Sequence, residues 1–558
     1  MATQAPQTNI YEWHSSEPDV WRRTCLGFEA SASFNQNIAN GHTELSVVTG
    51  FRMHRPRSSR IAAYELEFYE LVQRARQAWI QMRYLRPEVA VQMDTHTDPT
   101  VPQTLKYQVF RDEQSLRRWV NETFVVVHLG QPGANSVEEI CAYTYNRPLP
   151  TEGKQSMLYL VHPRLGDETD QSAHLIWNVS HAVTDGGSIV DFFNVLLQCM
   201  VDTVPSAPYD SIYIPNSFEL NVFPRLPRSV VSAYRQQFKP KPEETKKALE
   251  AAQANMRLIS DKMSQSLALQ PAASWPSRKH ETICLLKTME ATEAKALFKF
   301  AKQMGTGITY LASAATIMAT AETYPERKAS SKGALLGMVR NSRRWLSTTS
   351  VDGVTGTSTP LGSDAVFLWI PVDASGSLEP TLERLDDLVS IAGKIRYELG
   401  QHLTTPHCIS AFPTVANGQI SALTEQWSQI RSASAASPPL SQSQLESIIG
   451  AQAPGFSSVG EFKIKPRFQP ASASARASGV CLEFLDIIHR GRQVNASPWM
   501  SMVTVDGRLK FQLGFDTKFH DADKMTQLME LTFGWMRKCA AAGAANSSSD
   551  LTSVVARL

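Results

Sequence analysis

Four residues in one short run have the types and spacing of a catalytic loop: His181, Asp185, Gly186 and Gly187, in His-Ala-Val-Thr-Asp-Gly-Gly. An imidazole, with an ordinary pKa of about 6.5, can accept a proton at neutral pH and return it in the same cycle. This chemistry suits the deprotonation of an alcohol or amine nucleophile. Asp185 either turns back under the imidazole or faces an arginine that braces the loop, and the glycines allow close approaches that a side chain would block. The run therefore predicts that His181 is a general base on a supported loop.

The segments on both sides of this run predict a strand and a helix that hold the imidazole. Residues 172–181 are rich in β-branched and aromatic side chains and follow a turn-like segment, which is typical of a strand. The helix is indicated by apolar residues at three-and-four spacing: Ile189, Val190, Phe192, Phe193, Leu196, Leu197, Met200 and Val201. A structural alternative stays open, in which His181 only ends the strand and Asp185 only caps the helix.

The motif and the order of later segments resemble the superfamily of chloramphenicol acetyltransferase, plant alcohol acyltransferases and peptide-synthetase condensation domains. The later segments are a strand over 281–289, a helix over 291–304, a second helix entered from Gly305, an Asn341-x-Arg343 segment and a strand pair over 498–519. The closest likeness is to the stand-alone fungal O-acyltransferases, such as trichothecene 15-O-acetyltransferase. Ser180 stands where condensation domains usually carry a second histidine, which favours the free-standing enzymes. The plant-type Asp-Phe-Gly-Trp-Gly run does not occur, Gln512-Leu-Gly-Phe-Asp516 being the nearest stretch.

This resemblance implies an α/β fold of two similar mixed-sheet domains, flanked by helices, with a tunnel along their interface. Acyl-CoA, a co-substrate and not a permanently bound cofactor, and a small hydroxylated acceptor would enter from opposite mouths. His181 would deprotonate the acceptor hydroxyl as it attacks the thioester and then protonate the departing thiolate. The implied function is transfer of an acyl group, in the first instance acetyl, to a largely apolar secondary metabolite of the mycotoxin kind. Lys463, Lys465 and Arg467 could meet the phosphates of coenzyme A, although a charged exposed strand explains them equally well.

The resemblance also assigns supporting roles around the histidine. In the family the aspartate that matches Asp185 points away from the tunnel and pairs with an arginine, so Asp185 and Gly186 support the site structurally. Arg343 is the best candidate for that partner, with Arg340 and Arg344 as competitors and a solvated basic turn as the alternative. Oxyanion donors are needed as well. Candidates are the strand hydroxyls Ser457 and Ser458, which neighbouring backbone could instead satisfy.

The same comparison divides the chain into an N-terminal half over 1–235 with the motif, a helical connector over 236–275, a C-terminal half over 276–545 and a flexible tail over 546–558. Helices over 64–86 and 113–120 are expected to flank the first sheet. Two segments rich in small and polar residues, 347–363 and 432–443, are expected to be loops.

The composition argues against nucleic acids and membranes as partners of the protein. A net charge of +2 creates no field for nucleic acid or an anionic membrane, and no apolar run is long enough to span a bilayer. The histidines offer no defensible metal-ligand spacing, and Gly305-Thr-Gly307 lacks the third glycine of a dinucleotide fingerprint. We expect a monomer that holds no metal.

The cysteines and the chain ends indicate the cellular compartment of the protein. Seven widely spaced cysteines are typical of reduced thiols in an intracellular protein. The N-terminus lacks an apolar signal segment, and the tripeptide Ala556-Arg557-Leu558 is similar to a peroxisomal address. A cytoplasmic place, or a peroxisomal one through this tripeptide, is expected.

Two alternatives to the acyl-CoA enzyme remain open at this point. One is a condensation enzyme that takes its acyl group from an acyl carrier protein and forms an ester or an amide. The other is a non-catalytic relative that keeps the fold as a binding module. The intact His181 and Asp185-Gly186 argue against the second, because a degenerate relative needs neither.

Overall fold

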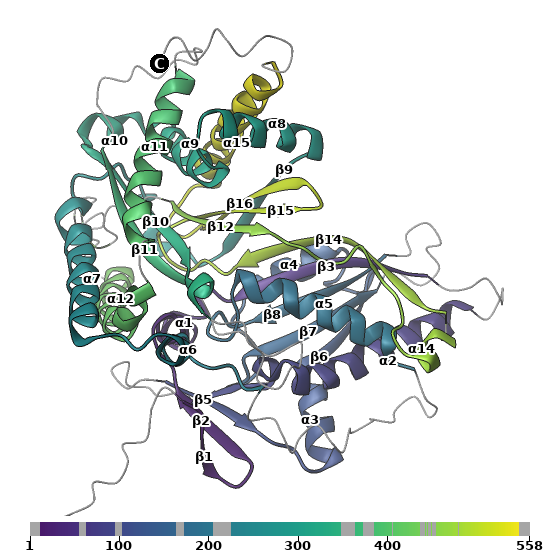
Figure 1. The fold of residues 1–558 in the computed structure, drawn as a ribbon. Helices are drawn as coiled ribbons and strands as arrows, with labels where there is room; N and C mark the ends of the chain where they lie inside the picture. The colour runs from purple at the N-terminus through teal and green to yellow at the C-terminus, as the bar shows by residue number, and fades with distance from the viewer. Residues whose placement is uncertain are drawn as a thin grey trace, which may run out of the picture.

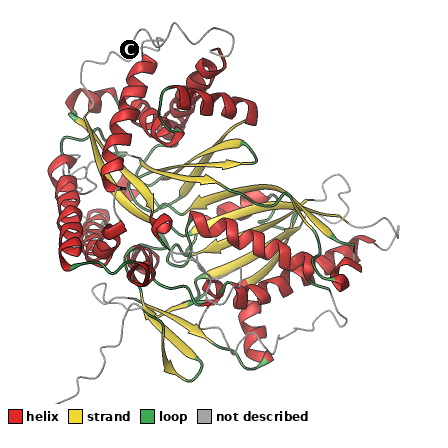
Figure 2. Cartoon of the chain, in the orientation of Figure 1, coloured by secondary structure: helices red, strands yellow, loops and turns green. Residues whose placement is uncertain are grey.

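The computed structural model describes residues 12–54, 63–94, 103–162, 172–204, 225–346, 363–371, 384–403, 406–435, 441, 444, 448, 454–477 and 479–545. These residues form two six-stranded sheets and one four-stranded sheet, each large sheet flanked by helices (Figures 1 and 2). The predicted class, an α/β fold with two mixed sheets and flanking helices, is confirmed. The 546–558 tail, with the tripeptide behind the peroxisomal prediction, lies outside the described residues.

The first large sheet carries the motif strand near its middle. Its order is β13 (Arg467–Phe468), β14 (Cys481–Gly491), β3 (Leu45–His54), β8 (Ser172–Val179), β7 (Ser156–His162) and β6 (Phe124–His128), with β6 and β7 parallel and the other pairs antiparallel. On one face Trp177 of β8 stacks on Phe192 of α5 (Gly186–Asp202), with ring centroids 3.6 Å apart. On the other face Ile176 packs with α4 (Val137–Tyr145). Both faces are therefore covered by helices, which include the predicted α2 (Ala63–Leu85) and α3 (Glu113–Thr123).

The second large sheet has one apolar face covered by helices and an opposite face that carries both polar and apolar residues. Its order is β11 (Ser363–Pro371), β10 (Gly333–Asn341), β12 (Gly455–Glu461), β15 (Trp499–Val505), β16 (Arg508–Asp516) and β9 (Thr282–Met289). The core over its apolar face includes residues of α8 (Ala291–Gln303), α9 (Ile308–Thr323), α11 (Arg384–His402) and α15 (Ala522–Ala545). The predicted strand at 281–289, the helix that follows it and the closing strand pair are confirmed.

The two halves of the chain are interlocked, because the C-terminal half supplies strands to the sheet of the N-terminal half. The predicted division of the chain, with a connector at 236–275, does not anticipate this exchange. Strands β13 and β14 come from the C-terminal half, yet they extend the first sheet (Figure 1). β14 pairs with β3 along its length, with an irregularity between Phe484 and Asp486. Arg490 of β14 binds Glu138 of α4 at 2.7 Å, which ties the strand to the helix on that face. The sheet of the motif is thus completed by residues from the far end of the sequence.

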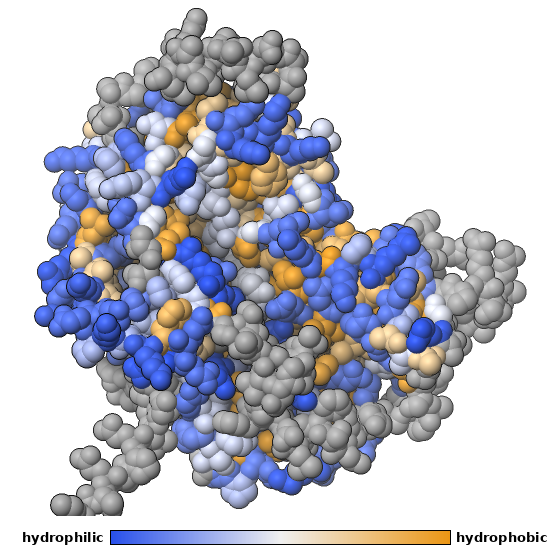
Figure 3. Space-filling view, in the orientation of Figure 1, coloured by the Kyte–Doolittle hydropathy of each residue, from blue (hydrophilic) through white to orange (hydrophobic). Residues whose placement is uncertain are grey.

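Smaller elements cover the sides of this framework. The four-stranded sheet joins β1 (His14–Glu17), β2 (Val20–Thr24), β5 (Thr104–Gln108) and β4 (Gln92–Asp94). Short helices and 3-10 turns are η1 (Pro87–Ala90), α6 (Val230–Gln237), η4 (Trp275–Ser277), α10 (Pro325–Ser330), η5 (Ser342–Trp345), η7 (Pro406–Ala411) and α14 (Ala473–Ala477). Figure 3 shows hydrophobic residues exposed in a hollow between the surface around α8 and that around α5.

The connector contains a long helix, α7 (Pro242–Met263), which lies against the edge of the second sheet. The Asn255 amide donates to the Phe367 carbonyl at 2.6 Å and accepts from the Phe367 N–H at 3.3 Å, so it pairs with the edge strand β11. The helix therefore protects an edge that would otherwise expose backbone donors and acceptors.

One predicted loop is wrong at its start. Residues 432–434 belong to α12 (Phe412–Ser434). The helix continues because Ile430 and Ala433 are buried in a cluster with Trp275 and Phe519. Most of 435–443 and nearly all of 347–363 lie outside the part of the chain that is described, while Ser363 begins β11.

Candidate active site

His181 lies in a tight turn between β8 and α5. Ser180 ends the strand region, and its hydroxyl donates to the Gln36 amide oxygen at 2.7 Å and accepts from the Ala182 N–H at 3.2 Å. The imidazole makes an edge-to-face contact with the ring of Phe28, the first residue of α1 (Phe28–Asn37), with centroids 4.7 Å apart. The ring is thus held by a strand, a turn and an aromatic neighbour.

One hydrogen bond assigns the two nitrogens of His181 different roles. Nδ1 lies 2.7 Å from the carbonyl oxygen of Thr184. A carbonyl only accepts, so Nδ1 carries the proton and Nε2 of the neutral ring keeps its lone pair. Burial lowers the pKa of His181, and the charge of Asp185 and the Thr184 carbonyl only partly oppose this shift. At neutral pH the side chain is therefore an uncharged base with Nε2 as the accepting atom.

The Asp185 carboxylate caps α5 and binds Arg343. Oδ1 accepts from the N–H groups of Gly187 and Ser188, both at 3.1 Å, and lies 2.6 Å from the Arg343 guanidinium. Burial alone would raise the pKa of this fully buried carboxyl, but the arginine outweighs it and the pKa falls to about 2. Asp185 is therefore an anion that holds the loop in place.

Arg343 links the second sheet to the helix that follows the histidine. It lies in η5, directly after β10, where the Asn341 side chain accepts from its N–H at 3.0 Å. Its Nη2 also donates to the Ser188 hydroxyl at 2.8 Å. The competitors are engaged elsewhere, since Arg340 donates to the His402 carbonyl at 3.0 Å and Arg344 to the Leu403 carbonyl at 2.5 Å.

The two glycines lie where neighbouring side chains leave no room. A Cβ atom on Gly186 would overlap the Val459 side chain of β12, and one on Gly187 would come within 2.6 Å of the Arg343 guanidinium. The need for glycine here is close approach, since neither residue has a positive φ. Both glycines therefore let the second sheet pack directly on the start of α5.

The two candidate serines face opposite sides of β12. The Thr309 hydroxyl of α9 donates to the Ser458 hydroxyl at 2.9 Å, which places Ser458 toward the helices of the second half. Ser457 pairs with Ser501 of β15 in the sheet register, and its neighbour Phe456 is buried in the core on the other side. Successive side chains of a strand alternate between faces, so Ser457 points away from that core. The structure thus brings His181, Asp185, Gly186 and Arg343 together but separates the directions of the two serines.

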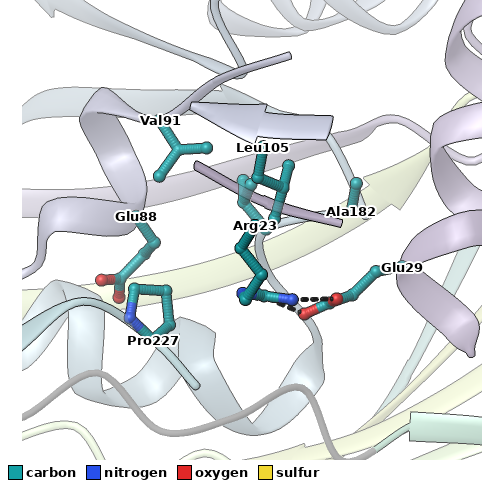
Figure 4. A pocket seen from close by; sticks show the side chains of 8 residues that line it. Arg23, Glu29, Glu88, Val91, Leu105, Ala182 and Pro227 are labelled. Atoms are coloured by element: carbon teal, nitrogen blue, oxygen red, sulfur yellow. Dashed lines mark hydrogen bonds and ion pairs between the residues drawn. The ribbon is translucent and has the colours of Figure 1, made fainter. Parts of the chain in front are cut away.

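Sequence reasoning missed the residues behind the histidine loop. Arg23 and Glu29 form a buried pair with two hydrogen bonds, of 2.6 and 2.8 Å, in a small pocket that Ala182 and Val183 also line (Figure 4). The bidentate geometry fixes the ends of β2 and α1 relative to the loop. No spacing in the sequence marks this pair, because ordinary strand and helix positions supply it.

Among the residues that the structure describes, no helix is long and apolar enough to cross a membrane. Nor do three or more of their histidine, cysteine, aspartate and glutamate side chains come together as a metal ion would require.

No family model matches the chain, but curated relatives match it over nearly their whole length, and two of them share most of its residues. It is 62% identical over 548 residues to acyl-CoA-dependent acyltransferase MAC1 of Mycosarcoma maydis, covering 98% of this chain and 93% of the relative. It is 60% identical over 550 residues to acyl-CoA-dependent acyltransferase MAC1 of Pseudozyma antarctica, covering 99% of each.

Solved structures share the fold. TRI3 trichothecene 15-O-acetyltransferase from Fusarium sporotrichioides superimposes with a TM-score of 0.71 at 17% identity, covering 95% of this chain and 98% of the other. The first condensation domain of the calcium-dependent antibiotic synthetase gives 0.55 at 12% identity, covering 95% and 97%. These likenesses confirm the predicted architecture of the chloramphenicol acetyltransferase and condensation type, while the interface tunnel stays a prediction.

Proposed function

The chain belongs to the family of acyl-CoA-dependent acyltransferase MAC1, and from this premise we propose that it transfers an acyl group from acyl-CoA to a hydroxyl of a small secondary metabolite. His181 is the general base of the proposed reaction. The observation that carries the proposal is the hydrogen bond of 2.7 Å between Nδ1 of His181 and the Thr184 carbonyl, because it leaves Nε2 free to accept a proton.

The proposed reaction has two steps with balanced proton transfer. Nε2 of His181 takes the hydroxyl proton while the acceptor oxygen bonds to the thioester carbonyl carbon, giving a tetrahedral oxyanion and an imidazolium. The intermediate then expels the thiolate of coenzyme A as the carbon–sulfur bond breaks. The imidazolium returns its proton to that sulfur, so the products are an ester and free coenzyme A, and His181 is neutral again.

Ser457 is the better of the two candidates for the oxyanion donor. Support comes from its direction, away from the apolar core of the second half, and from the engagement of Ser458 with Thr309 at 2.9 Å. A donor aimed at the developing negative charge typically contributes a few kcal/mol to the transition state. Asp185, Gly186 and Arg343 support the site structurally in this proposal.

The donor end is proposed to meet a basic segment after β12. The backbone of Lys463 and Lys465 is fixed by Asn194 of α5, whose amide donates to the Lys463 carbonyl at 3.1 Å and accepts from the Lys465 N–H at 3.0 Å. These lysines, with Arg467, could then meet the phosphates of coenzyme A. We also propose that the enzyme acts as a monomer, since His181, Asp185 and Arg343 of the proposed site all come from one chain and need no residue of a second copy.

The experiment incubates the purified protein with acetyl-CoA, or longer acyl-CoAs, and a panel of terpenoid and polyketide alcohols, and measures free thiol and product ester. A parallel arm supplies the same acyl groups on a phosphopantetheinyl carrier protein. Ester formation from acyl-CoA supports the proposal and defines the acyl length. Ester or amide formed only in the carrier-protein arm would favour a condensation enzyme instead, and binding of alcohols without thiol release would indicate a non-catalytic relative.

A further inference from the structure

A row of polar side chains crosses the second sheet on the face opposite its apolar core. The register aligns Ser457 of β12 with Ser501 of β15, and Ser501 with Gln512 of β16. Met500, which precedes Ser501, and Leu513, which follows Gln512, are both buried in the core between this sheet and its helices. Side chains alternate along a strand, so the polar row faces away from those helices.

His489 of β14 comes to the same region from the first sheet. It pairs with Val47 of β3, which in turn pairs with Trp177 of β8. Trp177 stacks on Phe192 of α5, so His489 shares the α5 face, whereas its neighbour Arg490 binds Glu138 of α4 on the other face. The exchanged strand therefore presents His489 near the end of β8 that leads to His181.

His489 lines one small pocket with Ser501 and Gln512 of the polar row, and its volume of about 10 Å³ leaves room for one water-sized group such as a hydroxyl. Its lining consists of Leu286, Ile488, His489, Ser501, Val503, Lys510 and Gln512. The Lys510 ammonium is held by the Asp486 carboxylate at 2.5 Å. Nδ1 of His489, by contrast, is buried and has no hydrogen-bond partner among the described residues. A buried polar atom without a partner is costly, so a ligand that satisfies it gains affinity.

The ring of His489 is an uncharged hydrogen-bonding group that lies within electrostatic reach of His181. Burial lowers the pKa of His489 to about 4, and electrostatic interactions with His181, Lys510 and Arg490 add to the shift. A neutral imidazole offers one donor and one acceptor nitrogen. Such a group can recognise a hydroxyl or carbonyl without placing a charge in the pocket.

We propose that His489, with Gln512 in the same pocket, hydrogen-bonds a polar group of the acceptor other than the hydroxyl that His181 deprotonates. The inference rests on the proposed function and adds an acceptor-binding residue to it. A pocket of this kind discriminates against an acceptor that lacks the second polar group, because His489 and Gln512 are then left unpaired.

The test uses two alcohols that differ by one hydroxyl, cyclohexanol and cis-cyclohexane-1,3-diol, with acetyl-CoA as donor. We compare kcat/KM for the two alcohols in the parent, His489→Ala and His489→Gln, with His174→Ala as a control for loss of a histidine near the start of β8. The parent is expected to favour the diol by about tenfold, the size expected for one hydrogen bond in the site. His489→Ala should bring the ratio near one, His489→Gln should keep part of it, and His174→Ala should keep the parent ratio.

An unchanged ratio in His489→Ala would overturn the inference and leave the proposed function standing. The inference also fails, without harm to the proposed function, if the parent shows no preference for the diol or if His489→Ala slows both alcohols equally. Failure of the parent to acylate either alcohol from acetyl-CoA, together with no transfer in the wider alcohol panel, would overturn the proposed function and this inference with it.

Discussion

Nδ1 of His181 lies 2.7 Å from the carbonyl oxygen of Thr184, within the turn that joins β8 to α5. The carbonyl fixes the tautomer that a general base requires, while Asp185 binds the helix N-terminus and Arg343. The charge that supports the loop is thus separate from the group proposed to move the proton. Replacing Arg343, the partner of Asp185, should therefore mainly reduce the stability of the fold, whereas replacing His181 should mainly reduce the rate of acyl transfer.

The pH dependence of kcat/KM should reflect the lowered pKa of His181. The base must be neutral to accept a proton, so the rate falls only when the pH drops through the pKa of the folded state, which burial moves below the ordinary value of about 6.5. We expect the acid limb of log kcat/KM to have its midpoint below pH 6.5. A midpoint at or above that value would contradict a partly buried, neutral base.

Replacing Arg343 should mainly reduce the free energy of unfolding of the protein. Arg343→Ala leaves the fully buried Asp185 carboxylate without its guanidinium, which should cost on the order of 3 kcal/mol in the free energy of unfolding. Denaturant titration measures the loss, with Arg344→Ala as the matched control. A stability equal to that of the parent would remove Arg343 from this role.

The same ion pair should respond to acid in a defined direction. The pKa of Asp185 is depressed to about 2 in the folded protein, so its contribution is complete above its ordinary pKa of about 4 and is lost as the pH falls toward 2. Without Arg343, burial should hold the folded-state pKa of Asp185 above its ordinary value of about 4. The stability difference between the parent and Arg343→Ala, measured by denaturant titration at several pH values, should therefore begin to shrink above pH 4 and keep shrinking down to about pH 2.

The close contact between Gly186 and β12 can be tested by rescue. Gly186→Ala forces a methyl group against the Val459 side chain and should cost about 1 to 3 kcal/mol of stability together with activity. Val459→Ala removes the obstructing methyl groups, so the double variant should recover much of both losses. Equal losses in the single and double variants would mean that Gly186 is required for another reason.

The serines of β12 form a matched pair for the oxyanion proposal. Ser457→Ala should lower kcat by about 10²- to 10³-fold if the hydroxyl stabilises the tetrahedral intermediate. Ser458→Ala removes only the hydrogen bond to Thr309 and should affect kcat little. A larger effect at Ser458 than at Ser457 would reverse the assignment.

The site was predictable where its residues are close in sequence or lie in a family segment. His181, Asp185 and Gly186 form one run between two strongly patterned elements, and Arg343 follows an Asn341-x-Arg343 segment that resembles relatives. Ser457 and Ser458 could not be separated, because the face of a strand depends on pairing with β15, which local sequence does not specify. The exchange of β14 into the first sheet is likewise a long-range choice of partner, and it places His489, which no motif in the sequence marks, on the α5 face of that sheet.

The most direct test of the account is the single-turnover rate of acyl transfer from acetyl-CoA in the parent and in His181→Ala, with the alcohol on which the parent is most active. Loss of the general base should lower the rate by about 10²- to 10⁴-fold while the thermal midpoint stays close to that of the parent. A folded His181→Ala protein that transfers acyl groups at the parent rate would contradict the central claim.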